Sequence, residues 1–311
     1  MGHYCCVYST EVFFQNPSFN YDVYVFHRPT LRMANPPLPR ILDILKSKGS
    51  LVIADYDDLI FGSEKYALES SLVKNKRLTP EEAIKIYEIN TYALCLFDHV
   101  TTSTAPLAVE AHAYNSNARV RVMPNIIPSS IYTLHEHYGT AFRPRKDTVI
   151  GYFPGTKSHD LDVLIVENVL VDILSKEHSC QLFVVGPVAL PKALKALPNV
   201  TRKLPVDYLD LFNVMSKCSV VLAPLEASLF NQCKSRVKFL EAAVAGCHLV
   251  ASPIDDMKQV GPHRLTLVET EADWFNALSS VKPHAARRKE IESNLEFIKK
   301  HDHVNDFISW S

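Results

Sequence analysis

Residues 220 to 251 read VVLAPLEASLFNQCKSRVKFLEAAVAGCHLVA, and this stretch decides the fold of the second half of the chain. It begins and ends with short apolar runs, Val220–Ala223 and His248–Ala251, which are typical of buried strands. Between them, residues 235 to 245 repeat apolar side chains at helical spacing. Parallel strands need a crossover connection, so a helix between two such strands predicts a parallel βαβ unit.

The same alternation continues on both sides of this unit. We expect strands at residues 149–153, 182–185, 200–204, 220–223, 248–251 and 265–268, and helices at 161–175, 190–197, 208–216, 235–245 and 272–281. Each strand must return to the same edge of the sheet through a crossover, so the pattern predicts an α/β fold with a doubly wound, Rossmann-like parallel sheet. Residues 284 to 301 read as a charged helix that adds no strand.

The first half of the chain shows the same pattern less regularly. Strands are expected at residues 21–27, 51–55, 99–102 and 120–123, and helices at 36–48 and 105–113 and from Thr79 onward. Thr79 is a cap for the last of these, because Pro80 and two acidic residues follow it. Residues 9 to 20 do not continue as a helix. The usual opening strand, Gly-rich turn and helix are therefore missing, and this Rossmann-like half is abbreviated.

A polar segment at residues 138–147 reads as an interdomain linker. We therefore predict an N-terminal acceptor-side domain over residues 1–143, a C-terminal domain over 144–283, and a final helix within 284–311 that packs back toward the first domain. Ligands of open α/β sheets bind at the carboxyl ends of the strands. We expect these edges of the two sheets to face each other across a cleft that holds the chemistry.

Composition narrows the class of protein. The chain has 33 Lys+Arg and 34 Asp+Glu, so no basic surplus indicates nucleic acid as a partner. Seven Cys show no paired spacing, which favours reduced thiols. No apolar run approaches the ~20 residues of a membrane span, and no signal peptide is evident. We expect a soluble, cytoplasmic protein.

A candidate anion site lies in the helix at residues 235–245. Lys234, Lys238 and Glu241 follow each other at spacings of four and three residues and share a face, and Ser235 lies near the helix start. Free N–H groups at a helix start, two lysines and a hydroxyl suit a diphosphate, and a carboxylate further along suits ribose hydroxyls. The alternative is a solvated Lys/Glu face with an ordinary ion pair. Spacing alone does not separate the two.

A second candidate loop follows the strand at 149–153 and opens a helix. Gly155 allows the backbone to approach a phosphate, and the next residues, Thr156, Lys157 and Ser158, supply donors. His159 is either a phosphate contact or a polar loop residue. Ser158 or Asp160 is alternatively the cap of the helix.

Polar residues also follow the strands of the first half. Asp55, Asp57 and Asp58 come at the end of one strand and indicate metal binding, polar contacts in the cleft or caps of the next helix. His27 ends the preceding strand and is either an acceptor-side base or a satisfied polar residue. Residues 101–104 and 124–125 also lie at strand ends.

The stretch from Phe230 to Gly246 resembles the donor-site signature of glycosyltransferase family 4 and related bacterial polysaccharide-building transferases. The shared pattern is a Pro-Leu loop, Phe-Asn, Lys-Ser and Lys-Phe-Leu-Glu-Ala-Ala-x-x-Gly, followed by a Val-Ala-Ser strand. The likeness covers most of residues 148 to 255, and the segment from Asp55 to Phe61 also resembles these proteins. It implies the two-domain GT-B fold, in which the segment from Gly155 to Asp162 faces the nucleotide diphosphate. A metal-binding Asp-x-Asp site belongs to a different, single-domain transferase fold, so we expect no metal.

One position departs from that family. Its Glu-x7-Glu pair places the first Glu where this chain has Cys233, while Glu241 matches the second. The hydroxyls of the donor sugar must then be held by other groups, for example backbone N–H groups at residues 230 to 232, which include Asn231. The resemblance also implies retention at the anomeric carbon.

The predicted function is transfer of a sugar from a nucleotide-diphosphate donor to a hydroxyl of a glycan or glycolipid, without a cofactor. Lys234 and Lys238 would stabilise the leaving diphosphate, and His27 and Asp57 would act on the acceptor side. Attachment at the inner face of a membrane, or to a partner domain, is a further expectation. The alternatives are a non-catalytic GT-B-like binding module of a larger assembly, or an epimerase or phosphorylase on the same architecture.

Overall fold

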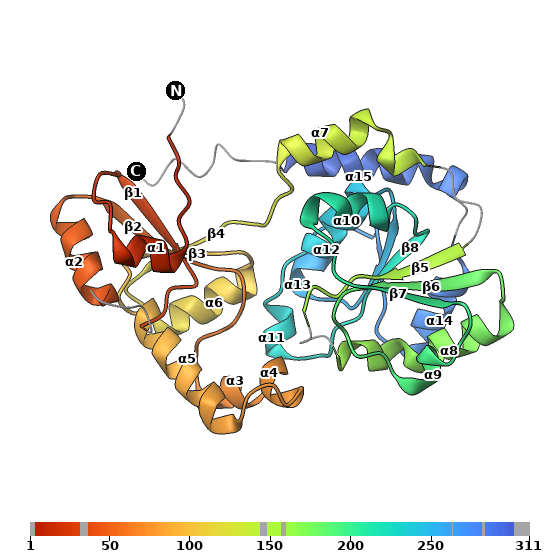
Figure 1. Cartoon of the computed structure of the whole chain (residues 1–311), viewed down its shortest axis with the longest axis horizontal. Coiled ribbons are helices and arrows are strands. Elements are labelled where there is room, and N and C mark those ends of the chain that lie inside the picture. Colours follow the sequence, from red (N-terminus) through yellow and green to blue (C-terminus); the bar gives the residue numbers. More distant parts are fainter. Residues whose placement is uncertain are drawn as a thin grey trace. The chain divides into compact units, whose positions relative to one another are not determined.

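The computed structural model describes residues 4–31, 37–143, 148–156, 160–262, 264–281 and 284–301. Its contacts divide the chain into two compact units, Met1–Pro124 and Asn125–Ser311. Each unit contains one parallel sheet (Figure 1). No helix in the described ranges is both long and apolar enough to cross a membrane.

The first unit is built on a four-stranded parallel sheet in the order β1-β2-β3-β4. Its strands are β1 (Val23–His27), β2 (Leu51–Tyr56), β3 (His99–Thr102) and β4 (Arg119–Val122). Its helices are α1 (Thr10–Gln15), α2 (Leu38–Ser47), α3 (Glu64–Leu68), α4 (Ser71–Lys74), α5 (Pro80–Leu94) and α6 (Ala105–Tyr114). Because strand order follows chain order, the three β-to-β connections run in one direction across the sheet.

Local sequence explains most of these elements. In α2, Ile41, Leu42 and Leu45 recur at helical spacing and are at most 2% exposed. The predicted start of α5 is confirmed: the Thr79 side chain accepts from the N–H of Glu82, and the Glu82 side chain accepts from the N–H of Thr79.

The prediction of no helix between residues 9 and 20 was wrong. Helix α1 occupies Thr10–Gln15, and its start is stabilised by Ser9, whose Oγ accepts from the N–H of Val12 at 3.3 Å. Phe13 and Phe14 of this short helix pack edge-on against each other. The single turn and a half is too short for a periodic apolar pattern, so tertiary packing decides it.

The second unit contains a six-stranded parallel sheet in the order β10-β9-β8-β5-β6-β7. Its strands are β5 (Thr148–Tyr152), β6 (Cys180–Val185), β7 (Val200–Lys203), β8 (Val220–Ala223), β9 (His248–Ala251) and β10 (Thr266–Leu267). Strand β5 pairs with β6 on one side and β8 on the other, so the direction of winding reverses there. This reversal is the switch point at which open α/β sheets bind ligands.

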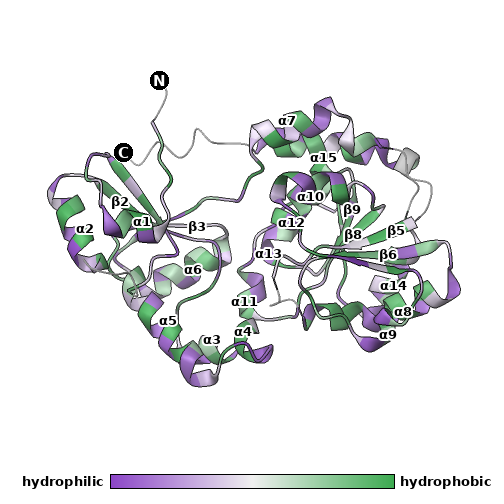
Figure 2. Cartoon of the chain, in the orientation of Figure 1, coloured by the Kyte–Doolittle hydropathy of each residue, from purple (hydrophilic) through white to green (hydrophobic). Residues whose placement is uncertain are grey.

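Helices cover both faces of this sheet (Figure 1). They are α7 (Ser129–His137), η1 (Thr140–Phe142), η3 (Asp162–Val166), α8 (Glu167–Lys176), α9 (Lys192–Lys195), α10 (Tyr208–Met215), α11 (Leu229–Gln232), α12 (Val237–Val244), α13 (Asp255–Lys258), α14 (Glu271–Ser279), η4 (His284–Arg287) and α15 (Arg288–Lys300). One core contains Phe212 of α10 and Phe239 of α12, and the other contains Leu170 of α8 and Trp274 of α14. Along the outer helices, hydrophilic and hydrophobic residues alternate in the ribbon (Figure 2).

Part of the segment predicted to be a linker is buried in the second unit. Thr140 and Ala141 of η1 are buried, and residues 144–147 lie outside the described residues. Gly246, which ends the α12 region, has φ +67°, and a Cβ there would lie 2.0 Å from the carbonyl oxygen of Ala141. Only glycine fits this backbone approach. Helix α7 also belongs to this unit by its contacts, ahead of residue 144, where we predicted the second domain to begin.

The final helix α15 packs on α12. Its apolar face includes Ile291, Leu295 and Ile298, all buried. Lys299 Nζ also lies 2.8 Å from Glu136 Oε1 of α7. These contacts make α15 part of the second unit, and residues 302–311 lie outside the described residues.

Candidate functional site

Helix α12 carries the two residues with the clearest arrangement. Lys238 Nζ donates to Glu241 Oε2 at 2.6 Å, one helical turn apart. The i, i+3 ion pair of the alternative interpretation is therefore present, although the side chains, at 23% and 9% exposed, are not fully solvated. A lysine ammonium can donate to an anionic group of a ligand, and a carboxylate can accept from its hydroxyl groups. The arrangement therefore suits a ligand that carries both kinds of group.

Two further candidate residues, Lys234 and Ser235, lie just before the start of α12. Lys234 Nζ lies 4.6 Å from the centroid of the Phe230 ring. Ser235 Oγ accepts from Asn125 Nδ2 at 2.7 Å. Sequence placed Asn125 only at a strand end, and the structure brings it to the start of α12.

The start of α12 also contains an ion pair that the sequence did not reveal. The Arg236 N–H donates to Asp256 Oδ2 at 2.7 Å, and Arg236 Nε lies 3.8 Å from the same oxygen. Burial raises the pKa of Asp256, and Arg236 opposes that rise. This N–H is therefore already engaged, and Asp256 fixes the first turn of α12.

Tyr208 is a further residue that sequence reasoning missed. It begins α10, and its pKa is raised to about 12, first by burial and then by the negative charge of Glu241. Helix α10 contacts α12, which carries Glu241. Nothing in the sequence around Tyr208, at the first position of α10, predicts an interaction with Glu241.

Asn231 and Cys233 lie on either side of the end of α11. Asn231 is 6% exposed, its N–H donates to Ser228 Oγ at 3.2 Å, and its Nδ2 donates to the Glu226 carbonyl at 3.0 Å. The Gln232 N–H also donates within the chain, to the Ser228 carbonyl at 2.9 Å. Two of the three backbone N–H groups that we considered for the donor sugar therefore already have partners.

The Cys233 side chain is completely buried in the second unit. A carboxylate at this position would be removed from water, which is costly without a partner. The Cys233 side chain therefore lies in the protein interior.

The loop after β5 is described only in part. Among the residues that the structure describes, no atom lies within 4 Å of a Cβ placed on Gly155, and Lys157, Ser158 and His159 lie outside the described residues. Thr156 follows Gly155 directly at the carboxyl end of β5. Asp160 does not cap η3: its Oδ1 accepts from the Ala189 N–H at 2.8 Å and so ties this loop to the one after β6.

In the first unit, strand register creates a cluster at the carboxyl ends of β1, β2 and β3. His27 is paired in register with Asp55, and Asp55 with Thr101. His27 Nδ1 lies 2.9 Å from Asp55 Oδ2, and Thr101 Oγ1 donates to Asp55 Oδ1 at 2.7 Å. The hydrogen bond to Asp55 raises the pKa of His27, with further help from the charges of Asp57 and Asp55, while burial and Arg28 oppose the rise.

Arg28 organises the remaining carboxylates of this cluster. It has φ +48°, which is uncommon for a residue with a side chain, and its Nη2 donates to Asp57 Oδ2 at 2.7 Å and to Asp58 Oδ2 at 2.9 Å. Burial opposes ionisation of Asp57, but Arg28 and His27 outweigh it, so the pKa of Asp57 is lowered.

The structure decides one of the three alternatives for these carboxylates. The next helix, α3, begins after Ser63, so none of the three aspartates caps it, and that alternative was wrong. In the part of the chain that the structure describes, no group of three His, Cys, Asp or Glu side chains is arranged to hold a metal ion.

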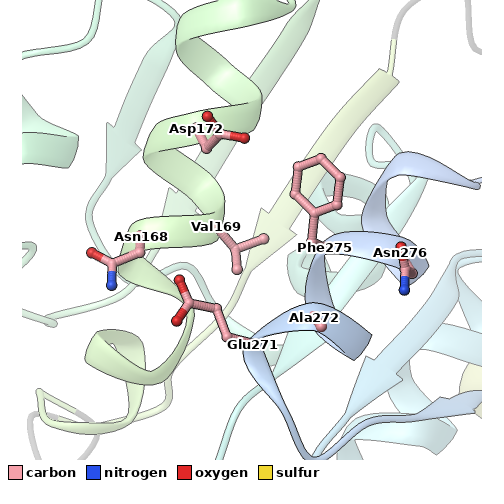
Figure 3. A pocket seen from close by; sticks show the side chains of 7 residues that line it. All are labelled: Asn168, Val169, Asp172, Glu271, Ala272, Phe275 and Asn276. Carbon is pink, nitrogen blue, oxygen red and sulfur yellow. The ribbon is translucent and has the colours of Figure 1, made fainter.

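A separate hollow of about 280 Å³ lies between α8 and α14 (Figure 3). Its lining residues are Asn168, Val169, Asp172, Glu271, Ala272, Phe275 and Asn276. None of the predicted site residues within the described ranges lines it, so it is separate from the candidate site on α12.

Comparisons with known proteins bear on the fold. No family model and no curated protein matches the sequence. Among solved structures, an α,α-trehalose-phosphate synthase (UDP-forming) from Burkholderia vietnamiensis has a TM-score of 0.59 at 14% identity, over 85% of this chain and 66% of that one. WaaG, a glycosyltransferase involved in lipopolysaccharide biosynthesis, has a TM-score of 0.57 at 15% identity, over 87% of this chain and 81% of that one. Trehalose-6-phosphate synthase from E. coli, solved with UDP-2-fluoro glucose, has a TM-score of 0.56 at 14% identity, over 85% and 68%.

The chain thus spans about two thirds of the length of the synthases. At these identities the likeness shows the fold. The predicted α/β class with two parallel sheets is confirmed, and so is the resemblance to GT-B glycosyltransferases.

Proposed function

We propose that the chain is a glycosyltransferase that moves a sugar from a nucleotide-diphosphate donor to a hydroxyl of a glycan or glycolipid. The observation that carries this proposal is the half-buried Lys238–Glu241 ion pair on α12. The fold that contains α12 is similar to that of solved glycosyltransferases. An ion pair of this burial is expensive to maintain unless it serves a ligand or a specific packing role.

The two members of the pair would contact different parts of the donor. Lys238 and Lys234, with the Ser235 hydroxyl, would contact the diphosphate, and Glu241 would accept from ribose hydroxyls. As the bond from the anomeric carbon to the phosphate oxygen breaks, its electron pair stays on the diphosphate. Lysine ammonium groups placed there stabilise the developing charge. This supply of positive charge is the reason to propose a metal-independent reaction.

Position 233 is a cysteine, so no carboxylate is present there to bind the donor sugar, and other groups must contact it. Gly155 and Thr156, with Lys157 and His159 further along the same loop, are proposed to approach the phosphates or the sugar. The resemblance to glycosyltransferase family 4 implies retention of configuration, and we include retention in the proposal. We also place the activity in the cytoplasm, with a membrane-attached glycan or glycolipid as one acceptor class.

The acceptor would bind at the cluster of the first unit, where His27 and Asp57 lie at strand ends. Two of the similar solved structures support a nucleotide-sugar donor and a sugar acceptor as ligand classes: one was solved with UDP-2-fluoro glucose and another with glucose-6-phosphate.

Release of nucleoside diphosphate from a panel of UDP-, GDP-, dTDP- and CMP-sugars tests the proposal, since CMP-sugars lack a diphosphate and serve as the internal control. We expect turnover of at least one diphosphate donor, slow with water alone and faster with an acceptor. NMR of the product then gives its anomeric configuration. Binding without turnover for every donor and acceptor would instead support a non-catalytic binding module.

A further inference from the structure

We infer that two copies of this chain associate through β1, whose free edge pairs antiparallel with the same strand of the second copy. The pairing joins the four-stranded sheets of the two copies into one continuous sheet with a two-fold axis at its centre. The inference concerns the first unit alone and does not rest on the proposed function.

Strand β1 lies at one end of its sheet and pairs with β2 on one side. The residues that flank the strand bond to β2 through their main chain: the carbonyl of Asp22 accepts from β2 and the N–H of Arg28 donates to β2, each at 2.8 Å. The main-chain groups of successive residues in a strand point to opposite sides. The N–H and carbonyl groups of Val23, Val25 and His27 therefore point to the open edge.

The side chains of β1 form an apolar surface at this edge. Val23 is 49% exposed and Val25 is 60% exposed, whereas Tyr24 between them is 7% exposed. The two valines thus lie on the face of the sheet opposite to Tyr24. β-branched residues on one face of a strand are the side chains that stabilise pairing with a neighbouring strand.

The segment before β1 adds apolar groups to the same region. Tyr8 Oη lies 3.0 Å from Tyr21 Oη, close to the start of β1. Phe13 of α1 packs against Tyr24 of β1, with 6.2 Å between the ring centroids. Val12, beside Phe13 in α1, is itself exposed. Contiguous apolar surface of this kind indicates an interaction site rather than scattered single residues.

The other edge strands of the two sheets have features that oppose pairing with a second copy. Strand β4 exposes Arg119 and Arg121, and β7 exposes Arg202 and Lys203. Strand β10 has only two residues. Charges on an edge and very short edge strands are common protections against edge-to-edge association. Among the edge strands of the described sheets, β1 alone combines five residues with two exposed valines.

The sequence around β1 is complementary to itself in an antiparallel register centred on Val25. In that register Val25 lies opposite Val25 of the second copy, and Val23 lies opposite His27. The three outward-facing residues then form the hydrogen-bonded pairs of an antiparallel ladder. Asp22 lies opposite Arg28, so each end of the paired strands brings opposite charges together. A two-fold pairing uses both free edges, and the assembly therefore closes at two copies.

The valines should contribute more to the affinity than the charges. Arg28 already donates to Asp57 and Asp58 within its own chain, so Asp22 of the second copy mainly favours the register. A pair of five-residue strands, even with the apolar groups before them, is small beside the ~1,600 Å² of a standard stable interface. We therefore expect association that depends on protein concentration.

Cysteine cross-linking tests the register. Opposite residues of an antiparallel hydrogen-bonded pair have Cα atoms about 5.5 Å apart, within the range of a disulfide. We expect Val25→Cys to form a disulfide-linked dimer under mild oxidation. Val23→Cys is the matched control, because its two copies lie about 14 Å apart in this register and should not link. Both variants carry Ser at positions 5, 6 and 95, where the native thiols are not buried.

Sedimentation velocity of the full chain, from about 1 to 100 µM, measures the association itself. We expect the wild type to shift from one copy toward two. Val25→Lys and Val25→Glu should each remain single copies, because like charges then lie opposite each other at the axis. An equimolar mixture of these two variants should associate, which also shows that both are folded. Val109→Lys is the control, because Val109 is an exposed valine of α6, which packs on β3 and β4, and this variant should associate like the wild type.

The outcomes decide the inference without reference to glycosyl transfer. A wild type that stays a single copy over this range would overturn it, whether or not another protein binds the edge. Undiminished association of Val25→Lys, or equal cross-linking through positions 23 and 25, would also overturn it. So would a mixture of Val25→Lys and Val25→Glu that fails to associate.

Discussion

Lys238 Nζ and Glu241 Oε2 lie 2.6 Å apart on one face of α12, with the carboxylate almost fully removed from solvent. The two residues assigned to diphosphate and ribose are thus each other's partner in the protein without ligand. In the proposed site, donor binding would exchange this ion pair for contacts to phosphate and hydroxyl groups, and the pair would couple the stability of α12 to donor binding.

Removal of Lys238 should lower stability as well as binding. Lys238→Ala leaves Glu241 buried without its cation, and we expect the free energy of unfolding to fall by ~2 kcal/mol. The double variant Lys238→Ala/Glu241→Gln should recover part of that loss, because no buried charge remains. Urea denaturation of the two single variants and the double variant measures the coupling. Equal stabilities in all of them would mean that the pair is effectively solvated.

Gly246 should tolerate no side chain. Gly246→Ala places a methyl group against the Ala141 carbonyl at a residue with positive φ, and we expect destabilisation of more than about 2 kcal/mol. Gly139→Ala is the matched control, since its φ is also positive, at +59°, but no atom lies within 4 Å of the added carbon. Thermal denaturation should rank the control well above Gly246→Ala. Equal losses would show that η1 does not dock on Gly246.

A glutamate at position 233, as in the family-4 pattern that the sequence resembles, should destabilise the protein. Cys233→Glu buries a carboxylate at a position with no exposure, which we expect to cost more than ~3 kcal/mol. Cys233→Ala, which removes only the thiol, should cost about 1 kcal/mol. Chemical denaturation compares the two. A Cys233→Glu protein as stable as the wild type, with altered donor preference, would contradict the inward orientation of this side chain.

The stability contributed by His27 should depend on pH. Its pKa is raised in the folded protein, so its contribution is fully present below the unfolded value of about 6.5 and is lost as pH rises through the folded pKa. We expect His27→Gln to be less stable than the wild type at pH 5.5 and equal to it at pH 9. The difference should stay below about 1 kcal/mol, because the side chain is largely exposed. A difference that grows with pH would contradict the pairing with Asp55.

The second unit was well predicted because its strands are continuous apolar runs between amphipathic helices. Val220–Ala223 and His248–Ala251 form strands over the residues expected of them. The same apolar periodicity placed Lys238 and Glu241 on one face of α12. Sequence could not reveal that the pair is partly buried, because burial depends on the elements packed around α12.

The contacts that sequence missed all depend on register or on long-range packing. The triad of His27, Asp55 and Thr101 exists because β1, β2 and β3 pair in register, and a shift of one residue would separate these side chains. The Arg236–Asp256 pair joins residues from two different helix starts. Residues 138–147 are polar, and the sequence therefore predicted a linker. The buried residue Ala141 nevertheless packs closely against Gly246 through its backbone.

Isothermal titration calorimetry with the nucleotide-sugar panel tests the central claim most directly. We expect at least one nucleotide-diphosphate sugar to bind the wild type, and Lys238→Ala to weaken that binding about 10- to 100-fold, the value of one lost charge-assisted hydrogen bond. Lys176→Ala is the control, because Lys176 forms a pair of the same 2.6 Å length with Asp172 on α8, away from α12. Unchanged affinity in Lys238→Ala, or equal losses in both variants, would contradict the assignment of α12 as the donor site.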